Sequence, residues 1–170
     1  MKVVFLDLDG VMNIYQKGYT CVNGYPDQRI TPEAVHYLNE ITRITGAKIV
    51  VSSSWRRCYT IKKLRDMLNV QSGIQGEIID VTPMDLWQRV QKLNVYRGDE
   101  IQYWLDQHPE VESFVILDDD DDMCHLLPKL VRTPGFRSGS GLSRKNAATA
   151  IKILCPESKR QHVKIASVVV

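Results

Sequence analysis

The sequence contains few cysteines, no long hydrophobic run and almost no net charge, and each of these absences excludes a class of protein. The four cysteines are scattered and form no CxxC pair, so neither a zinc finger nor a thiol redox motif is indicated. No apolar segment approaches the roughly 20 residues that a membrane-spanning helix needs. The net charge of +2 does not by itself indicate a nucleic acid or a membrane as the partner. The chain begins with a predicted strand and leaves no room for a signal peptide, so we expect a cytoplasmic protein with no membrane contact.

The length and composition indicate one globular domain. With 170 residues, 44% of them hydrophobic and 25% charged, the chain can bury a single core and is too short for two ordinary domains. We predict that this domain spans residues 1–155. Residues 156–170 are predicted to form either a tail or an additional strand. The protein is expected to be a monomer or a homodimer.

Short β-branched segments alternate with amphipathic segments along the chain. Strands are predicted at residues 3–6, 48–51, 76–82, 111–117 and 130–133. Helices are predicted at residues 32–45, 60–68, 97–108 and 142–154. This alternation predicts the α/β class, with a Rossmann-like three-layer α/β/α architecture and a mainly parallel sheet. Residues 11–30 are predicted to form a loop or a small flap, and residues 70–96 an irregular insertion.

The N-terminal segment VVFLDLDG places two carboxylates at the end of a buried strand. Residues 3–6 suit such a strand, whereas Asp7 and Asp9 would repel each other and lose hydration unless something compensates them. In an extended segment both side chains would point to the same face. Gly10 would then let the chain turn away sharply and leave both carboxylates uncovered at the edge of the sheet. We therefore interpret this segment as part of a functional site.

Two further polar segments, residues 52–54 (SSS) and 118–122 (DDDDD), also follow predicted strands. Because ligands bind beyond the carboxyl ends of parallel strands, we expect both segments to lie beside Asp7. Several carboxylates in one place require a cation, and a set of oxygen ligands favours Mg²⁺. Asp7 and Asp118 are the predicted metal ligands, while the middle of the acidic run is predicted to be exposed.

This set of groups suits the transfer of a phosphoryl group. Asp7 would act as the nucleophile and form an aspartyl-phosphate. Asp9 would protonate the leaving oxygen and later activate water. A further cation must offset the charge of the transferring group in its transition state. Arg97, which opens a predicted helix, is the first candidate for this cation and Lys63 is the second.

The serine segment and the arginines after it suit the binding of phosphate. A hydroxyl and backbone N–H groups at a strand-to-helix turn make an anion site, although the same serines would equally serve as a helix cap. Arg56 and Arg57 would hold a phosphate or its neighbour through bidentate contacts. Trp55 adjoins this site, and a tryptophan is more often a core residue than a base-stacking platform.

Together these segments resemble the motifs of the haloacid-dehalogenase (HAD) superfamily, whose commonest members are Mg²⁺-dependent phosphatases. The first motif is similar to DLDGV, and the resemblance implies that the backbone of Asp9 also ligates the metal. The second motif, a strand that ends in Ser or Thr, matches IVVSS, with Ser52 as the best fit and Ser53 as the alternative. The fourth motif matches VILDD with Asp118 and Asp119, and Asp122 fits its spaced variant. The third motif is usually a Lys or Arg.

A narrower resemblance covers most of residues 1–154. The segments FLDLDGVMN, VVSSSWRR, RGDEIQYWL and VILDDDDDM together look like the HAD domain found with RNA-repair enzymes. This similarity implies relatedness to phosphatases that clear phosphates from polynucleotide ends. SSSWR also resembles the Ser-x-Arg segment of polynucleotide kinase-phosphatases, which implies that Arg56 binds the substrate phosphate. Ser53 and Gly10 are predicted to bind substrate beside it.

HAD enzymes usually carry a cap domain that closes over the substrate. Here the two insertion places, residues 11–30 and 70–96, are too short for a full cap domain, so a minimal cap is expected. A nearly open site would suit a large phosphorylated substrate, such as the end of a nucleic acid or a phosphoprotein. It would equally suit a small nucleotide if a second subunit supplied the lid. The alternative function is a non-catalytic module that binds phosphate or nucleic acid and keeps the same fold.

Overall fold

The computed structural model describes residues 1–14, 30–86, 94–138 and 140–156. The predicted flap at 11–30, the insertion at 70–96 and the segment 156–170 therefore lie partly or almost wholly outside the described residues. None of the helices in the described part of the chain has the length and the hydropathy of a membrane span.

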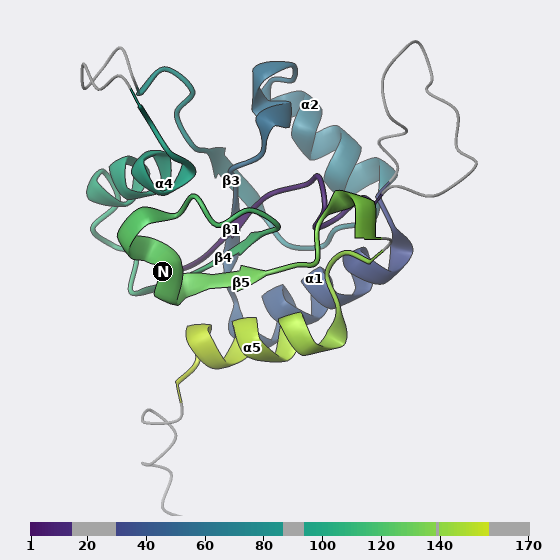
Figure 1. Ribbon diagram of the computed structural model, residues 1–170. Coiled ribbons are helices and arrows are strands. Elements are labelled where there is room, and N and C mark those ends of the chain that lie inside the picture. The colour runs from purple at the N-terminus through teal and green to yellow at the C-terminus, as the bar shows by residue number, and fades with distance from the viewer. Residues whose placement is uncertain (15–29, 87–93, 139, 157–170) are drawn as a thin grey trace, which may run out of the picture.

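A five-stranded parallel sheet forms the middle of the molecule (Figure 1). The strand order is β3-β2-β1-β4-β5, so the N-terminal strand is central. The bounds are Lys2–Leu6 for β1, Lys48–Val51 for β2, Ile78–Val81 for β3, Ser113–Asp118 for β4 and Leu130–Arg132 for β5. Every neighbouring pair is parallel, which confirms the predicted α/β class and its parallel sheet.

The longer helices lie close to their predicted positions. Their bounds are Pro32–Thr45 for α1, Ile61–Arg65 for α2, Arg97–Asp106 for α4 and Arg144–Leu154 for α5. Short helical turns are η1 (Ser54–Arg57), η2 (Asp66–Gln71, a π-helical continuation of α2), η3 (Cys124–Lys129) and η4 (Phe136–Ser138). Thr31 caps the start of α1 by accepting a hydrogen bond from the Ala34 amide, and Gly46 ends the helix at φ 68°.

Apolar side chains cover both faces of the sheet, and they alternate along each strand. Leu6, Val51 and Leu117 belong to the core shared with α1, α2 and α5. Phe5 and Ile116 belong to the core on the opposite face, and α4 and η3 cover that face. Figure 1 shows α1 and α5 together on one side of the sheet and α4 on the other. The three-layer arrangement predicted from the sequence is confirmed. The same alternation determines to which face of the sheet the side chains at the ends of the strands point.

Candidate active site

Asp7, Ser52 and Asp118 lie in one row at the carboxyl edge of the sheet. Leu6 is in register with both Val51 and Leu117, so the residue after each of these three strand positions falls in the same row. The Asp7 amide donates to the Leu117 carbonyl at 2.9 Å, and the Ser52 amide donates to the Leu6 carbonyl at 2.9 Å. The structure thus brings together the three segments that the sequence predicted to meet.

The three residues of this row are buried. Asp7 is 6% exposed and Asp118 is 1% exposed, although both carry a carboxylate. Side chains two residues apart along a strand point to the same face of the sheet. Asp7 is two residues after Phe5, and Asp118 is two residues after Ile116, so both carboxylates point into the face that α4 covers. The start of α4 is therefore the element that can supply them with a partner.

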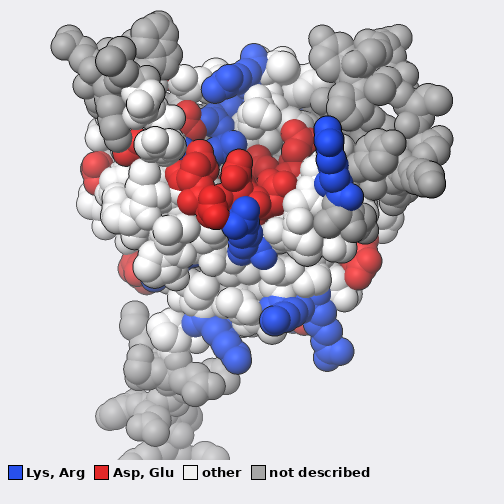
Figure 2. All heavy atoms as spheres, in the orientation of Figure 1, with Lys and Arg blue, Asp and Glu red and all other residues white. Residues whose placement is uncertain are grey.

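A third carboxylate joins Asp7 and Asp118. Among the described residues, Asp7, Asp118 and Asp119 each offer an oxygen atom, and these atoms all lie within 4.8 Å of one another. Figure 2 shows acidic side chains gathered near the middle of one face of the molecule, with basic side chains beside them. Asp119 was not among the predicted metal ligands, because the run of five aspartates does not indicate which side chains turn inward.

Gly10 allows Asp119 to approach the first motif. Its φ of +80° lies in the left-handed region, and a Cβ atom there would lie 2.3 Å from Oδ2 of Asp119. The Gly10 carbonyl also accepts a hydrogen bond of 2.9 Å from the buried Thr133 hydroxyl. A glycine at this position is thus explained by its backbone conformation and by the close contact with Asp119. Its binding of substrate stays a prediction.

The crowded carboxylates have strongly raised pKa values. Burial, together with the nearby Asp9, raises the pKa of Asp7 to about 6, against the opposing effect of Arg97 and of a hydrogen bond from the Ser53 side chain. Burial and then the charge of Asp7 raise the pKa of Asp118 to about 7. Oδ2 of Asp118 is buried and has no hydrogen-bond partner within the described part of the chain. An oxygen-only site with an orphaned carboxylate oxygen fits Mg²⁺.

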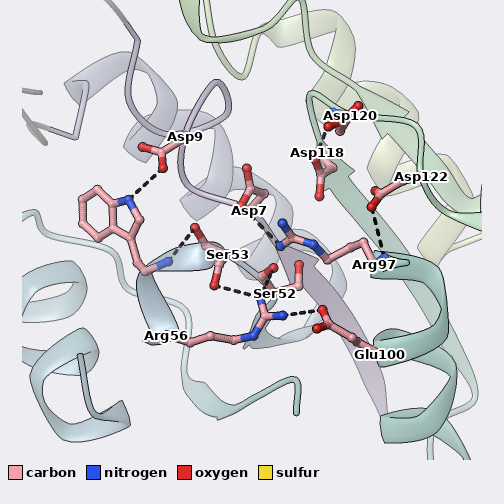
Figure 3. A network of polar contacts seen from close by, with 11 residues as sticks. Asp7, Asp9, Ser52, Ser53, Arg56, Arg97, Glu100, Asp118, Asp120 and Asp122 are labelled. Atoms are coloured by element: carbon pink, nitrogen blue, oxygen red, sulfur yellow. Dashed lines mark hydrogen bonds and ion pairs between the residues drawn. The ribbon is translucent and has the colours of Figure 1, made fainter. Parts of the chain in front are cut away.

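Arg97 is the cation that the fold places at this cluster. Its Nη1 atom lies 3.5 Å from Oδ1 of Asp7, and its side chain faces both Asp7 and Asp118 in Figure 3. Burial lowers the pKa of Arg97, but Asp7, Asp118 and two further carboxylates outweigh it and raise the pKa above its ordinary value. Lys63, the second candidate, instead pairs with Asp66 three residues further along the chain, at 3.1 Å.

The acidic run itself fixes the start of α4. Oδ2 of Asp122 accepts a hydrogen bond of 3.1 Å from the Arg97 amide, and the Asp122 carbonyl accepts one of 3.1 Å from the Gly98 amide. A Cβ atom on Gly98 would lie 2.2 Å from the Met123 carbonyl oxygen, so only glycine permits this contact. Asp122 therefore caps the helix that carries Arg97.

The serine segment presents the Ser53 side chain to the nucleophile candidate. A side-chain hydrogen bond from Ser53 lowers the pKa of Asp7, while the Ser53 Oγ atom also accepts from the Trp55 amide at 3.4 Å. The Ser52 hydroxyl is buried and has no hydrogen-bond partner among the residues that the structure describes. The sequence favoured Ser52, whereas the contact with Asp7 comes from the alternative, Ser53.

Arg56 does not face the site. It is 5% exposed, its Nη1 atom donates to the carbonyl oxygens of Ser52 and Ser53, and its Nη2 atom pairs with Glu100 of α4 (Figure 3). Burial lowers the pKa of Arg56, and the neighbouring Glu100 opposes this effect. This placement does not support the predicted binding of a substrate phosphate, because the guanidinium is already used inside the fold. Arg56 and Glu100 instead join the serine segment to the helix of Arg97.

Asp9 turns away from the row. We expected Asp7 and Asp9 to share a face, but β1 ends at Leu6 and the amides of Met12 and Asn13 both bond to the Leu8 carbonyl, so the chain is already turning. In Figure 3 the Asp9 side chain is directed to the indole of Trp55. Asn13 and Glu100 are buried polar residues at the site, and although both lie in segments that carry the family resemblance, the sequence predicted no role for either.

Comparisons with known proteins give one match. The family model described as "HAD domain in Swiss Army Knife RNA repair proteins" matches residues 3–147. A search of curated proteins and a search of solved structures each found no match. The family match and the aspartate cluster support a function of the HAD phosphohydrolase type. The chain belongs to the family of HAD domains found in these RNA repair proteins.

Proposed function

We propose that this protein is a Mg²⁺-dependent phosphohydrolase that acts through an aspartyl-phosphate at Asp7. The observation that carries the proposal is the row of buried groups at the sheet edge. Asp7 and Asp118 lie in register there, and Arg97 lies 3.5 Å from Asp7. A nucleophile, a set of metal ligands and a cation thus meet at the edge where parallel sheets bind their ligands.

The reaction has two steps. An oxygen of Asp7 attacks the phosphorus atom and forms a new P–O bond, while the bond from phosphorus to the leaving oxygen breaks and Asp9 gives that oxygen a proton. Water then attacks the phosphorus atom, Asp9 takes back a proton, and the bond between Asp7 and phosphorus breaks to release phosphate. Arg97 stabilises the charge that develops on the phosphoryl oxygens in both steps.

Asp7, Asp118 and Asp119 would hold the metal ion, with the backbone of Asp9 as the further ligand that the family pattern implies. When bound, Mg²⁺ would neutralise charge on the phosphoryl group and allow the buried carboxylates to remain ionised at neutral pH. The raised pKa values of Asp7 and Asp118 describe the site without this compensation.

For the substrate we propose a phosphate on a nucleotide or at the end of a polynucleotide. The family is described by its presence in RNA repair proteins, which supports this class. The insertions at residues 11–30 and 70–96 are short for cap domains, so a large substrate could reach Asp7.

The test is a phosphate-release screen of the purified protein with Mg²⁺. The panel comprises nucleotides, oligonucleotides with 3′ or 5′ phosphates, sugar phosphates and phosphopeptides. Asp7→Asn should abolish release, and acid quenching should trap phosphate on Asp7 in the wild-type protein. Asp120→Asn is the matched control, because it removes an exposed carboxylate from the same acidic run and should leave release unchanged.

Two results would contradict the proposal. Full activity of Asp7→Asn would exclude this residue as the nucleophile, and an unchanged rate after removal of Mg²⁺ would exclude the metal. A protein that is inert toward the whole panel but shifts labelled oligonucleotides would favour the alternative, a non-catalytic binding module.

A further inference from the structure

Both carboxylate oxygens of Asp9 accept a hydrogen bond from a separate side chain. Oδ2 accepts from the indole Nε1 of Trp55 at 3.0 Å, and Oδ1 accepts from the amide Nδ2 of Asn13 at 2.9 Å. A carboxylate can only accept, so the nitrogen of the Asn13 amide must be the atom that faces it. The amide oxygen of Asn13, Oδ1, is buried without a partner within the described residues, so the hydrogen bond from Nδ2 to Asp9 is the contact that orients this amide.

The two donors are themselves fixed by the fold. Trp55 is 4% exposed, and its backbone carbonyl accepts from the amides of Cys58 and Tyr59 at 2.9 and 3.0 Å. Asn13 is 1% exposed. Its backbone N–H donates to the Leu8 carbonyl at 3.0 Å, and its backbone carbonyl accepts from the backbone N–H of Gly10 at 2.9 Å. Neither donor can follow Asp9 if that side chain rotates. Rotation of Asp9 would therefore leave two buried donors without partners.

The same turn also contacts the nucleophile candidate. Ser53, which begins this turn, contributes the side-chain hydrogen bond to Asp7, and Trp55 two residues later contributes the one to Asp9. The Trp55 amide in turn donates to the Ser53 Oγ atom at 3.4 Å. One short segment after β2 thus holds Asp9 through Trp55 and lowers the pKa of Asp7 through Ser53. Figure 3 shows the contact with Asp9.

We propose that Trp55 and Asn13 are positioning residues that fix the orientation of Asp9 for proton transfer to the leaving oxygen. The inference rests on the proposed function, since it assigns to Asp9 the role of acid and base. An unrestrained aspartate side chain samples several rotamers, and proton transfer needs the one that reaches the leaving oxygen. The two hydrogen bonds hold a single orientation before the substrate binds.

This role predicts a dependence on the leaving group. An alkoxide leaving group requires a proton as its bond to phosphorus breaks, whereas nitrophenolate leaves readily without one. Loss of the Trp55 hydrogen bond should therefore slow hydrolysis of an alkyl phosphate much more than hydrolysis of nitrophenyl phosphate. A defect in folding, in metal binding or at Asp7 would slow both substrates alike.

The kinetic test compares Trp55→Phe with Trp104→Phe. Trp104 is also 4% exposed and also donates its indole N–H to a carboxylate, Asp80, at 2.7 Å, so the two variants lose the same kind of contact. We expect Trp55→Phe to lower kcat/KM for an alkyl phosphate roughly tenfold and kcat/KM for nitrophenyl phosphate less than twofold, because kcat/KM reports the step in which the leaving group departs and not the later hydrolysis that both substrates share. Trp104→Phe should not change the rate with the alkyl phosphate relative to the rate with nitrophenyl phosphate. Adding Trp55→Phe to Asp9→Asn should cause no further loss, because both act on the same step.

Three kinetic outcomes would overturn the proposal. They are equal losses of kcat/KM on both substrates, effects of Trp55→Phe and Asp9→Asn on kcat/KM that multiply in the double variant, and an increase in kcat/KM. The last of these would mean that the hydrogen bonds hold Asp9 away from the reacting position. Asn13→Ala repeats the comparison should Trp55→Phe fail to fold.

A second test needs no activity. The indole N–H resonance of Trp55, assigned by its loss in Trp55→Phe, should move upfield in Asp9→Ala and stay in place in Asp80→Ala. The Trp104 resonance should show the opposite pattern. An unmoved Trp55 resonance in Asp9→Ala would overturn the proposed contact. A protein that shows the contact but hydrolyses no phosphate ester would instead refute the proposed function, so the two failures are distinguishable.

Discussion

Replacing Asp118 with asparagine should stabilise the metal-free protein at alkaline pH. The side chain is 1% exposed, and burial and the charge of Asp7 raise its pKa to about 7 from an ordinary value of 3.8. Asparagine has nearly the same shape, and its carbonyl oxygen can still accept the hydrogen bond of 3.0 Å from the Asp120 amide. The substitution therefore removes the buried charge and keeps the contact.

The sign and the size of this stabilisation follow from the pKa of Asp118 in the folded protein and its ordinary pKa. The pKa of Asp118 is higher in the folded state, so the folded protein binds more protons, and its stability falls as the pH rises through the window from about 4 to about 7. One pKa unit corresponds to about 1.4 kcal/mol, so ionised Asp118 costs the folded state about 4 kcal/mol at pH 8. Near pH 4 the same group costs less than about 1 kcal/mol.

The assay is urea unfolding of the wild type and Asp118→Asn at pH 4.5 and pH 8, first without metal and then with Mg²⁺. Without metal, the variant should be more stable by about 4 kcal/mol at pH 8 and by only about 1 kcal/mol at pH 4.5. Mg²⁺ should stabilise the wild type more than the variant, because it binds the folded wild-type site. Asp120→Asn, which removes an exposed charge, should change the free energy of unfolding by less than about 0.5 kcal/mol at either pH. An Asp118→Asn protein that is no more stable than the wild type at pH 8, or equally stabilised at pH 4.5, would refute the reasoning.

Three further sets of variants test the groups around Asp7. Glu100→Gln breaks the buried ion pair with Arg56 and should lower the free energy of unfolding by about 3 kcal/mol in urea titrations, and a change below about 0.5 kcal/mol would contradict the role of this pair. Ser53→Ala should lower kcat by roughly 10-fold or more, because it removes a hydrogen bond to the charged Asp7. Ser52→Ala should lower kcat less, and the reverse order would restore Ser52 as the serine of the site. Arg97→Met should lower kcat by about 100-fold or more, with Arg97→Lys in between, and equal rates for all three proteins would exclude Arg97 as the stabilising cation.

The fold could be predicted from the sequence because its signals are local. β-branched segments separated by amphipathic ones specify the parallel sheet, and the cap at Thr31 and the left-handed Gly46 mark both ends of α1. The row of Asp7, Ser52 and Asp118 follows from the same information, because Asp7 and Ser52 directly follow β1 and β2 and Asp118 ends β4, in a sheet whose carboxyl ends are aligned. Residue type and distance from a strand end were sufficient for this part of the site.

The contacts beyond the strand ends could not be predicted in this way. Arg56 is three residues from Ser53, the serine that contacts Asp7, yet its partner Glu100 is 44 residues away in the chain, and no local pattern indicates that pairing. Asp9 lies three residues beyond the end of β1 at Leu6, where the turn has begun and the alternation of a strand no longer applies. In both cases the side chain follows a tertiary contact rather than the periodicity of its own segment.

The five aspartates that begin at the last residue of β4 show how position in a turn gives identical residues different roles. Asp118 still obeys the alternation of the strand and is buried in the row. Asp119 contributes an oxygen to the same cluster, and its Oδ2 atom accepts from the Phe136 amide at 3.2 Å. Asp120 and Asp121 are exposed, and Asp122 caps the helix that carries the arginine of the site. Replacement of any one residue in the run by asparagine changes the total charge equally, but only at Asp118 and Asp119 does it change the proposed metal site. The effect of each substitution on Mg²⁺ affinity should therefore follow the geometry of the turn and not the charge of the run.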